Sequence, residues 1–193
     1  MLRTYGCDVT VASSFDVQEL TATVLRLGRV VVLLDLHLRD VVSIPLIRPL
    51  TATGAVVILL TADTEPSLLG RALLEGAVAV LSKEAVFTDI VFSIQQAWDG
   101  ERAMSQGSRE DLLAAGREAD QEERRRLAPF ESLTVREQVV LRHLLSGRSP
   151  KHIAQLESVS VLTVRTQLRS SFTKLGVGSQ REAIALANAA GWS

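Results

Sequence analysis

The chain has 193 residues, of which 47% are hydrophobic, 22% charged and only 4% aromatic, and its formal net charge is −1. This composition favours a packed aliphatic core and argues against a disordered chain. The single cysteine, Cys7, excludes an internal disulfide and a metal site of paired cysteines, and no apolar run is long enough to cross a membrane, so we expect a soluble cytoplasmic protein.

The first 100 residues alternate short β-branched runs with longer helical patterns. The patterns predict strands at 8–12, 29–35, 54–62 and 78–83, and helices at 14–28, 66–77 and 86–100. Pro45 and Pro49 interrupt residues 36–53, where we expect a short or broken helix. Apolar strands separated by helices are typical of a parallel sheet covered on both faces, so we predict an α/β domain over residues 1–100.

Residues 101–130 are rich in charge and poor in large apolar side chains. Such a segment is usually solvated, so we predict a linker over 101–130 that is helical around 109–127. The net charge differs in sign between the residues up to 130 and those after it. The net charge is −5 over residues 1–130 and +4 over residues 131–193. A basic end on an acidic body suggests that this end binds an anionic partner.

The sequence predicts an all-α domain of four helices over residues 131–193. The helix-start signals are capping residues: Thr134 with Glu137, Ser149 before Pro150, Ser160, and Ser179 with Glu182. Gly147 and Gly176 lie where helices should stop. The expected helices span roughly 134–146, 150–157, 161–175 and 180–190.

Polar side chains follow three successive predicted strands. Asp35 follows "VVVLL", Thr61 follows "VVILL" and Lys83 follows "VAVLS". The carboxyl ends of parallel strands meet at one edge of a sheet, so we expect these three side chains to converge there. A carboxylate nucleophile could accept a phosphoryl group at such a site, with the hydroxyl and the ammonium group steadying its oxygens.

The third helix of the basic end has one apolar face and one polar face. Val164 and Leu168 lie one turn apart and predict the buried face, whereas Arg165, Thr166 and Arg169 fall on other faces. Two short helices joined by a tight turn suit a helix-turn-helix, and arginine can bind guanine bidentately in the major groove. The residues that suit contact with DNA phosphates are Thr134, Lys151, Ser160, Thr163 and Lys174.

Residues 8–100 resemble the receiver domain of bacterial two-component response regulators. The matching segments are "VVVLLDLHL", "VVILLTA" and "EGAVAVLSK". The resemblance implies a flavodoxin-like fold with strand order 2-1-3-4-5. It also implies that Asp35 is the phosphoacceptor position, Thr61 the switch alcohol and Lys83 the phosphate-contacting lysine.

The sequence departs from this family in one respect that bears on its chemistry. The family's first strand ends in an acidic pair that holds Mg²⁺, and the 7 residues before "DVTVA" cannot encode that strand and its helix. We therefore predict an incomplete, atypical receiver with no metal and no cofactor. The two strands that flank the missing one could pair directly, a second subunit could cover them, or the protein could start further upstream.

Residues 133–191 resemble the LuxR/NarL-type DNA-binding domain over their whole length. "LTVREQVVLRHLLSG" matches the opening helix, "SPKHIAQLESVS" the scaffold helix, and "TVRTQLRSSFTKLGVGSQREAIALA" the last two helices. The resemblance implies that Arg165, Thr166 and Arg169 face bases and that Glu137 forms the capping and intradomain ion pair. It further implies that the fourth helix forms a dimer surface, with Ile184, Leu186 and Ala187.

The combined reading is a transcriptional regulator and not an enzyme. We expect a homodimer that binds double-stranded DNA at an inverted-repeat operator and is controlled through its receiver by a regulatory protein or small molecule. One alternative is a conventional response regulator, or a phosphotransfer protein, in which Asp35 takes phosphate from a histidine kinase. Another is a protein-interaction module whose helical end binds a protein.

Overall fold

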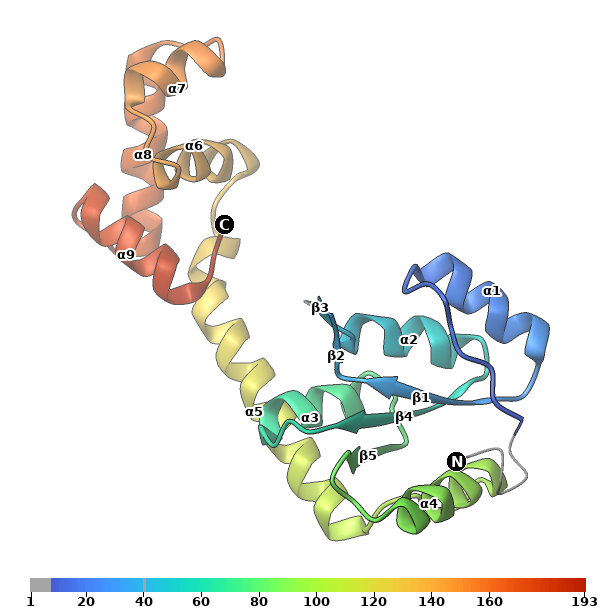
Figure 1. The fold of residues 1–193 in the computed structure, drawn as a ribbon. Coiled ribbons are helices and arrows are strands. Elements are labelled where there is room, and N and C mark those ends of the chain that lie inside the picture. The colour runs from blue at the N-terminus through green and yellow to red at the C-terminus, as the bar shows by residue number, and fades with distance from the viewer. Residues whose placement is uncertain (1–7, 40) are drawn as a thin grey trace. The chain divides into compact units, whose positions relative to one another are not determined.

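The computed structural model describes residues 8–39 and 41–193, which fall into two units divided between Ala119 and Asp120. The first unit contains α1 (Val17–Leu27), β1 (Val31–Asp35), β2 (His37–Leu38), β3 (Val41–Val42), α2 (Ile44–Ala52), β4 (Val56–Thr61), α3 (Pro66–Leu74), β5 (Ala79–Ser82) and α4 (Phe87–Asp99) (Figure 1). Helix α5 (Gln106–Glu131) crosses the division. The second unit continues with α6 (Val135–Leu145), α7 (Pro150–Leu156), α8 (Val161–Leu175) and α9 (Gln180–Ala190).

A three-stranded parallel sheet in the order β1-β4-β5 forms the centre of the first unit. Side chains alternate across it, so that Val57 and Leu59 pack with α1, α2 and α3, whereas Ile58 packs on the other face with Ala97 of α4. Figure 1 shows α1 and α2 on one side of the sheet and α4 on the other. The predicted α/β architecture with helices on both faces is confirmed, on a smaller sheet than the resemblance implied.

The strand predicted at 8–12 was wrong. These residues form no regular structure, and the Val11 side chain is 83% exposed. An alternating pattern becomes a strand only where a neighbouring strand supplies hydrogen bonds, and within the described residues none pairs with this segment. Residues 8–12 therefore do not pair with β1 as a strand, which was one of the three possibilities that the sequence left open.

The remaining predicted elements of the first unit are present with small changes of boundary. Asp16 caps α1 and Gly28 ends it, and α2 is short and contains Pro49. The small antiparallel hairpin of β2 and β3 was not predicted. Helix α5 is longer than the helical stretch expected around 109–127. The role of residues 101–130 as a linker stays a proposal.

The first part of α5 packs closely on α3 through two glycines. A Cβ atom built on Gly116 would lie 2.6 Å from the carbonyl carbon of Gly70 and 2.9 Å from the amide nitrogen of Arg71. Leu112 and Leu113 pack against the core of the first unit, and Arg109 Nη1 donates to the Val78 carbonyl at 2.8 Å. The backbones can approach this closely because neither glycine carries a side chain.

Gly116→Ala is expected to destabilise the first unit by roughly 1–3 kcal/mol, because the added methyl group meets backbone atoms that cannot rotate away. The measurement is urea unfolding followed by Trp98 fluorescence in a Trp192→Phe background. Gly107→Ala is the matched control, because Gly107 lies in the same helix with open space around it. Gly107→Ala should leave stability unchanged or raise it by up to about 1 kcal/mol. Equal effects of the two variants would contradict the close contact.

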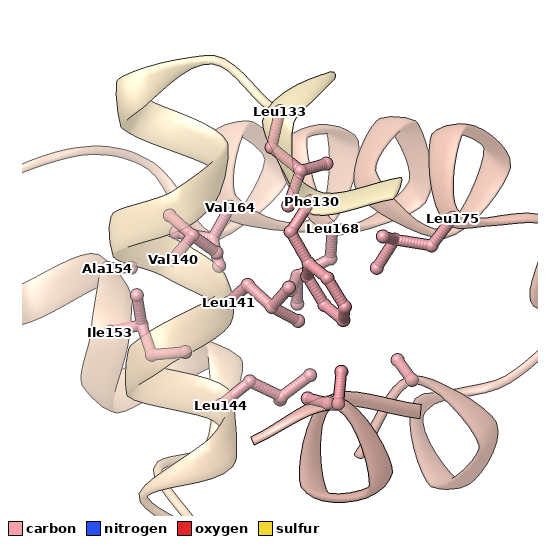
Figure 2. Packing of buried hydrophobic residues seen from close by; sticks show 13 residues of the cluster. Phe130, Leu133, Val140, Leu141, Leu144, Ile153, Ala154, Val164, Leu168 and Leu175 are labelled. Atoms are coloured by element: carbon pink, nitrogen blue, oxygen red, sulfur yellow. The ribbon is translucent and has the colours of Figure 1, made fainter. Parts of the chain in front are cut away.

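The second unit is built around one aliphatic core that includes a fully buried aromatic residue, Phe130. Leu141, Leu144, Ile153 and Val164 are fully buried, and Phe130 stacks on Trp192 with 4.9 Å between ring centroids. Figure 2 shows Phe130 pointing into the cluster beside Leu141. The four predicted helices are confirmed, as are the caps at Thr134, Ser149, Ser160 and Ser179.

Within residues 8–39 and 41–193, no helix combines the length and the apolar character that a membrane crossing requires.

Candidate nucleic-acid interface and receiver-like site

Helix α8 separates a buried face from a polar exposed face, as predicted. Ser160 starts it by accepting a hydrogen bond from the Thr163 amide at 3.0 Å, and Gly176 ends it in the left-handed conformation. Val164 and Leu168 are buried in the core against α6 and α7. The helix is therefore anchored along one side, which leaves the opposite side available to a ligand.

Arg165, Thr166 and Arg169 all lie on the exposed side of α8. The Thr166 hydroxyl donates to the Leu162 carbonyl one turn back, at 3.0 Å. Among the described residues, neither arginine has a hydrogen-bonding or ion-pair partner, so both guanidinium groups keep all of their donors. Their assignment to DNA bases stays a prediction.

Leu162 extends this exposed side by one turn and was missed by the sequence-based interpretation. It is 74% exposed at the beginning of α8. Its spacing from Arg165, Thr166 and Arg169, at three, four and seven residues, places all four on one stripe of the helix. The spacing was visible in the sequence, but an apolar residue at a helix start is usually assigned to the core.

The side chains predicted to contact phosphates differ in whether they already have a hydrogen-bonding partner. Lys151 is exposed near the start of α7 and has no partner among the described residues. Thr134 and Ser160 act as helix caps, and the Thr163 hydroxyl lies 2.8 Å from that of Ser160. The Lys174 ammonium group is already paired with Glu137 at 2.7 Å. Contacts of these residues with DNA stay predictions.

Glu137 joins α6 to α8 through a buried carboxylate. One oxygen accepts from the Ser170 hydroxyl at 2.6 Å, and the other accepts from Lys174 Nζ at 2.7 Å and from the Thr134 amide at 2.7 Å. This confirms the capping box and the intradomain ion pair expected for Glu137. The sequence named neither Ser170 nor Lys174 as a partner of Glu137, because they lie 33 and 37 residues away.

The electrostatics of this cluster favour the charged form of Glu137. Burial by itself would raise the pKa of the carboxyl group, which is only 6% exposed. The hydrogen bonds from Lys174, Ser170 and Thr134 outweigh burial and lower the pKa to about 2. The carboxylate is therefore ionised at neutral pH and holds the second half of α8 in place.

The predicted dimer surface on α9 needs one correction. Ala187 is fully buried in the core of the second unit, together with Ala183 and Ala190, so it cannot form part of a surface. Its small side chain is what lets α9 pack closely on the other helices. Ile184 and Leu186 are partly exposed, and their place in a dimer surface stays a prediction.

At the carboxyl edge of the sheet in the first unit, Asp35 and Lys83 meet as predicted. Lys83 Nζ donates to Asp35 Oδ2 at 2.5 Å, and the backbone N–H of His37 donates to Asp35 Oδ1 at 3.2 Å. Both carboxylate oxygens of Asp35 are thus engaged. The side chains of Asp35 and Lys83 remain 35% and 42% exposed, so the ion pair is open to solvent.

Thr61 lies at the end of β4 but does not join that ion pair. Its hydroxyl accepts from the Asp63 amide at 2.9 Å and makes no hydrogen bond to Asp35 or Lys83. Asp63 in turn lies 3.3 Å from His37 Nε2. The hydrogen bond from the Glu65 amide, and to a smaller extent the one with the His37 ring, lowers the pKa of the Asp63 carboxyl group. The pairing of His37 with Asp63 was not predicted, because a two-residue hairpin positions His37.

The carboxylates at this edge do not fit a bound Mg²⁺ ion. A divalent cation needs several free oxygen ligands, whereas Asp35 is neutralised by Lys83 and Asp63 is paired with His37. In the described part of the chain, no three His, Cys, Asp or Glu side chains gather into a metal site. The chemistry available at this edge is therefore that of a carboxylate beside an ammonium group.

Comparison with known proteins extends over both units. Residues 131–187 match the family model described as "Bacterial regulatory proteins, luxR family". The chain is 28% identical over 162 residues to transcriptional regulatory protein DesR of Bacillus subtilis, which covers 84% of this chain and 74% of DesR. It is 32% identical over 130 residues to "Probable transcriptional regulatory protein NarL" of Mycobacterium tuberculosis, covering 67% of this chain and 57% of that protein.

Among solved structures, the response regulator StyR is similar at 25% identity and a TM-score of 0.41, over 97% of this chain and 89% of StyR. The match to DesR is longer than the second unit and so must include part of the receiver-like unit. The chain therefore belongs to the LuxR/NarL family of response regulators, a family of DNA-binding transcription factors and not of enzymes, with a receiver-like domain on a small parallel sheet followed by a LuxR-type helix-turn-helix domain.

Proposed function

We propose that this regulator reads an inverted-repeat DNA operator as a homodimer, by inserting the exposed side of α8 into the major groove. The observation that carries the proposal is the stripe on α8, where Arg165 and Arg169 are exposed and unpartnered in the described structure while Val164 and Leu168 anchor the opposite side. A recognition helix needs this division, because one side must be fixed while the other meets base edges.

The residue types on the stripe suit direct readout of bases. Each arginine can donate two hydrogen bonds to O6 and N7 of a guanine, and the Thr166 side chain offers a hydroxyl and a methyl group. Leu162 can contact a thymine methyl group, as apolar side chains do in the major groove. Lys151 and the amide groups at the starts of α6 and α8 support phosphate contacts, and the net charge of +4 over residues 131–193 attracts the duplex.

An operator that is an inverted repeat has two-fold symmetry, so a dimer is expected to bind it. Two copies related by a two-fold axis would place their α8 helices about one turn of DNA apart. The partly exposed Ile184 and Leu186 on α9 are the side chains proposed to meet across that axis. The DNA partner places the protein in the cytoplasm as part of this proposal.

Control of DNA binding is proposed to pass through the receiver-like unit without ordinary Mg²⁺-dependent phosphorylation. Each oxygen of Asp35 already accepts one hydrogen bond, one from Lys83 and one from the His37 amide. Phosphoryl transfer to a carboxylate also needs a cation to neutralise the phosphate, and in the described part of the chain no three His, Cys, Asp or Glu side chains gather into a metal site. A regulatory protein or small molecule that acts on this unit is therefore the proposed input.

Incubation with a small phosphodonor and Mg²⁺ is expected to label wild-type protein no more than Asp35→Asn. The readout is the acid-stable mass shift or radiolabel of the intact chain. Lys83→Ala is a second comparison, because it frees one oxygen of Asp35. Stoichiometric labelling of wild type that disappears in Asp35→Asn would instead support the conventional response regulator, in which a histidine kinase supplies the phosphate.

The experiment that tests DNA binding itself is selection from a random double-stranded library with the purified full chain. The expected product is a motif with two inverted half-sites whose centres lie about 10 base pairs apart, or a multiple of that spacing. The selection is run with and without phosphodonor, and the same motif and yield are expected in both. Recovery of no motif would contradict the proposal.

A further inference from the structure

The edge of β1 that faces away from β4 lacks a partner in the described structure. The Val56 amide donates to the Val30 carbonyl at 3.0 Å, and Val31 is paired in register with Val56. In a parallel ladder this places the hydrogen-bonding groups of Val30, Val32 and Leu34 toward β4, and those of Val31 and Leu33 toward the opposite edge. No strand in the described part of the chain pairs with that edge of β1.

Residues 30–34 themselves carry none of the sequence features that normally prevent strand addition. Exposed edges are usually blunted by a lysine, a proline or a bulge. Residues 30–34 are "VVVLL", and Val31 and Leu33 are only partly buried. At the end of the strand, the Ser43 hydroxyl donates to the Asp35 carbonyl at 2.6 Å. In the described structure, the amide and carbonyl groups of Val31 and Leu33 are therefore available to a further strand.

The sequence of this strand is complementary to itself when read in the opposite direction. "RVVVLLD" begins with the basic Arg29 and ends with the acidic Asp35, with five apolar residues between them. We propose that the free edge of β1 pairs antiparallel with β1 of a second copy of this chain, around a two-fold axis at Val32. The two three-stranded sheets then join into one sheet in the order β5-β4-β1-β1-β4-β5.

Backbone hydrogen bonding permits this register, and the charged ends of the strand select it. The axis at Val32 sets Val31 opposite Leu33 of the second copy, and these are the residues whose backbone groups face outward, so four inter-strand hydrogen bonds can form. The same axis sets Arg29 opposite Asp35 of the second copy, twice. Shifting the axis by one residue along the strand sets Asp35 opposite Val31 or Arg29 opposite Leu33, and loses both charge pairs.

The side chains of the proposed pairs lie on one face of the sheet. Val31 and Leu33 pack with residues of α4, and the Arg29 guanidinium stacks at 4.6 Å over the ring of Trp98 on the same helix. The Arg29 side chain also donates to the Trp98 carbonyl, which holds it at the start of the strand. Cross-strand pairs of opposite charge stabilise such an edge, whereas like charges weaken it.

This pairing would couple dimerisation to the receiver-like site. Asp35 would lie between Lys83 of its own chain and Arg29 of the second copy, so any ligand that neutralises or engages Asp35 would also change the interface. The inference goes beyond the proposed operator binding and does not depend on it. A dimer made through α9 would leave the edge of β1 free.

The first test is disulfide cross-linking of the full chain. Val32→Cys in a Cys7→Ser background puts one cysteine at the two-fold axis, where facing Cα atoms lie about 4.5 Å apart, a separation that a disulfide can span. Mild oxidation is expected to yield mostly covalent dimer. Leu25→Cys, on the exposed surface of α1, is the matched control and should stay monomeric on denaturing gels. Equal yields from the two variants would overturn the proposal.

The second test is the charge at Arg29. In the Val32→Cys, Cys7→Ser background, Arg29→Glu sets like charges against Asp35 twice and should lower the yield of cross-linked dimer about tenfold at equal concentration. Arg29→Lys should retain most of it. Circular dichroism is used to show that both variants fold. A yield unchanged in Arg29→Glu, or the absence of Val32→Cys dimer because another segment occupies the edge, would refute this pairing.

Discussion

Arg165→Ala and Arg169→Ala are each expected to weaken binding to the selected operator roughly 10–100-fold, and the double variant by more. Each arginine that binds one guanine with two hydrogen bonds is worth about 1–3 kcal/mol of discrimination. The affinities are compared by fluorescence anisotropy on the operator and on a scrambled duplex. The loss should be largest on the operator, so that preference for it over the scrambled duplex also falls.

Two other positions separate this effect from general loss of charge. Lys151→Ala should weaken binding to operator and scrambled DNA alike and lower the slope of log affinity against log salt by about 1. Arg181→Ala, an exposed arginine on α9, should change little. Weak salt dependence together with full affinity in Arg165→Ala would favour the alternative that the helical unit binds a protein.

Glu137→Ala is expected to destabilise the second unit by roughly 3 kcal/mol. The variant removes the buried carboxylate and with it the common acceptor of the hydrogen bonds from Lys174, Ser170 and the Thr134 amide, which together tie α6 to α8. Unfolding is followed through Trp192 fluorescence in a Trp98→Phe background. Glu131→Ala, an exposed carboxylate in α5, is the control and should change stability by less than about 0.5 kcal/mol.

The same carboxylate gives a predictable pH dependence. The pKa of Glu137 is about 2 in the folded protein and 4.5 in an unperturbed glutamate, so the unfolded chain binds the proton more tightly. The stabilisation is therefore complete above pH 4.5 and is lost as the pH falls from about 4.5 toward 2, by roughly 3 kcal/mol in all. Glu137→Gln should lack this part of the acid sensitivity. An unchanged acid profile in Glu137→Gln would contradict the assignment.

The helical unit was predicted well because its signals are local. Capping residues, glycine stops and the spacing of Val164 and Leu168 all act within one or two turns of a helix, and each is readable from neighbouring residues. Burial between elements was not readable in the same way. Ala187 matched a family position for a dimer surface, yet it lies inside the core, because only the packing of α9 decides which side of it is covered.

The receiver-like unit shows where local pattern is insufficient. The strand at 29–35 and its meeting with Lys83 followed from the order of strands in a parallel sheet. The segment at 8–12 has an equally strong alternating pattern, but no described strand pairs with it. The contact between His37 and Asp63 depends on a hairpin of two-residue strands, which is too short to leave a periodic signal.

The burial of Phe130 limits where the helical domain can be joined to a different N-terminal domain. The family model begins at residue 131, yet Phe130 is fully buried in the helical core and Leu127 packs against that core. A recombination point at residue 131 would leave Trp192 without the ring on which it stacks. The folded helical unit is therefore longer than the segment that the family model matches. A chimaeric regulator that keeps this core intact would have to be joined upstream of Leu127, within α5.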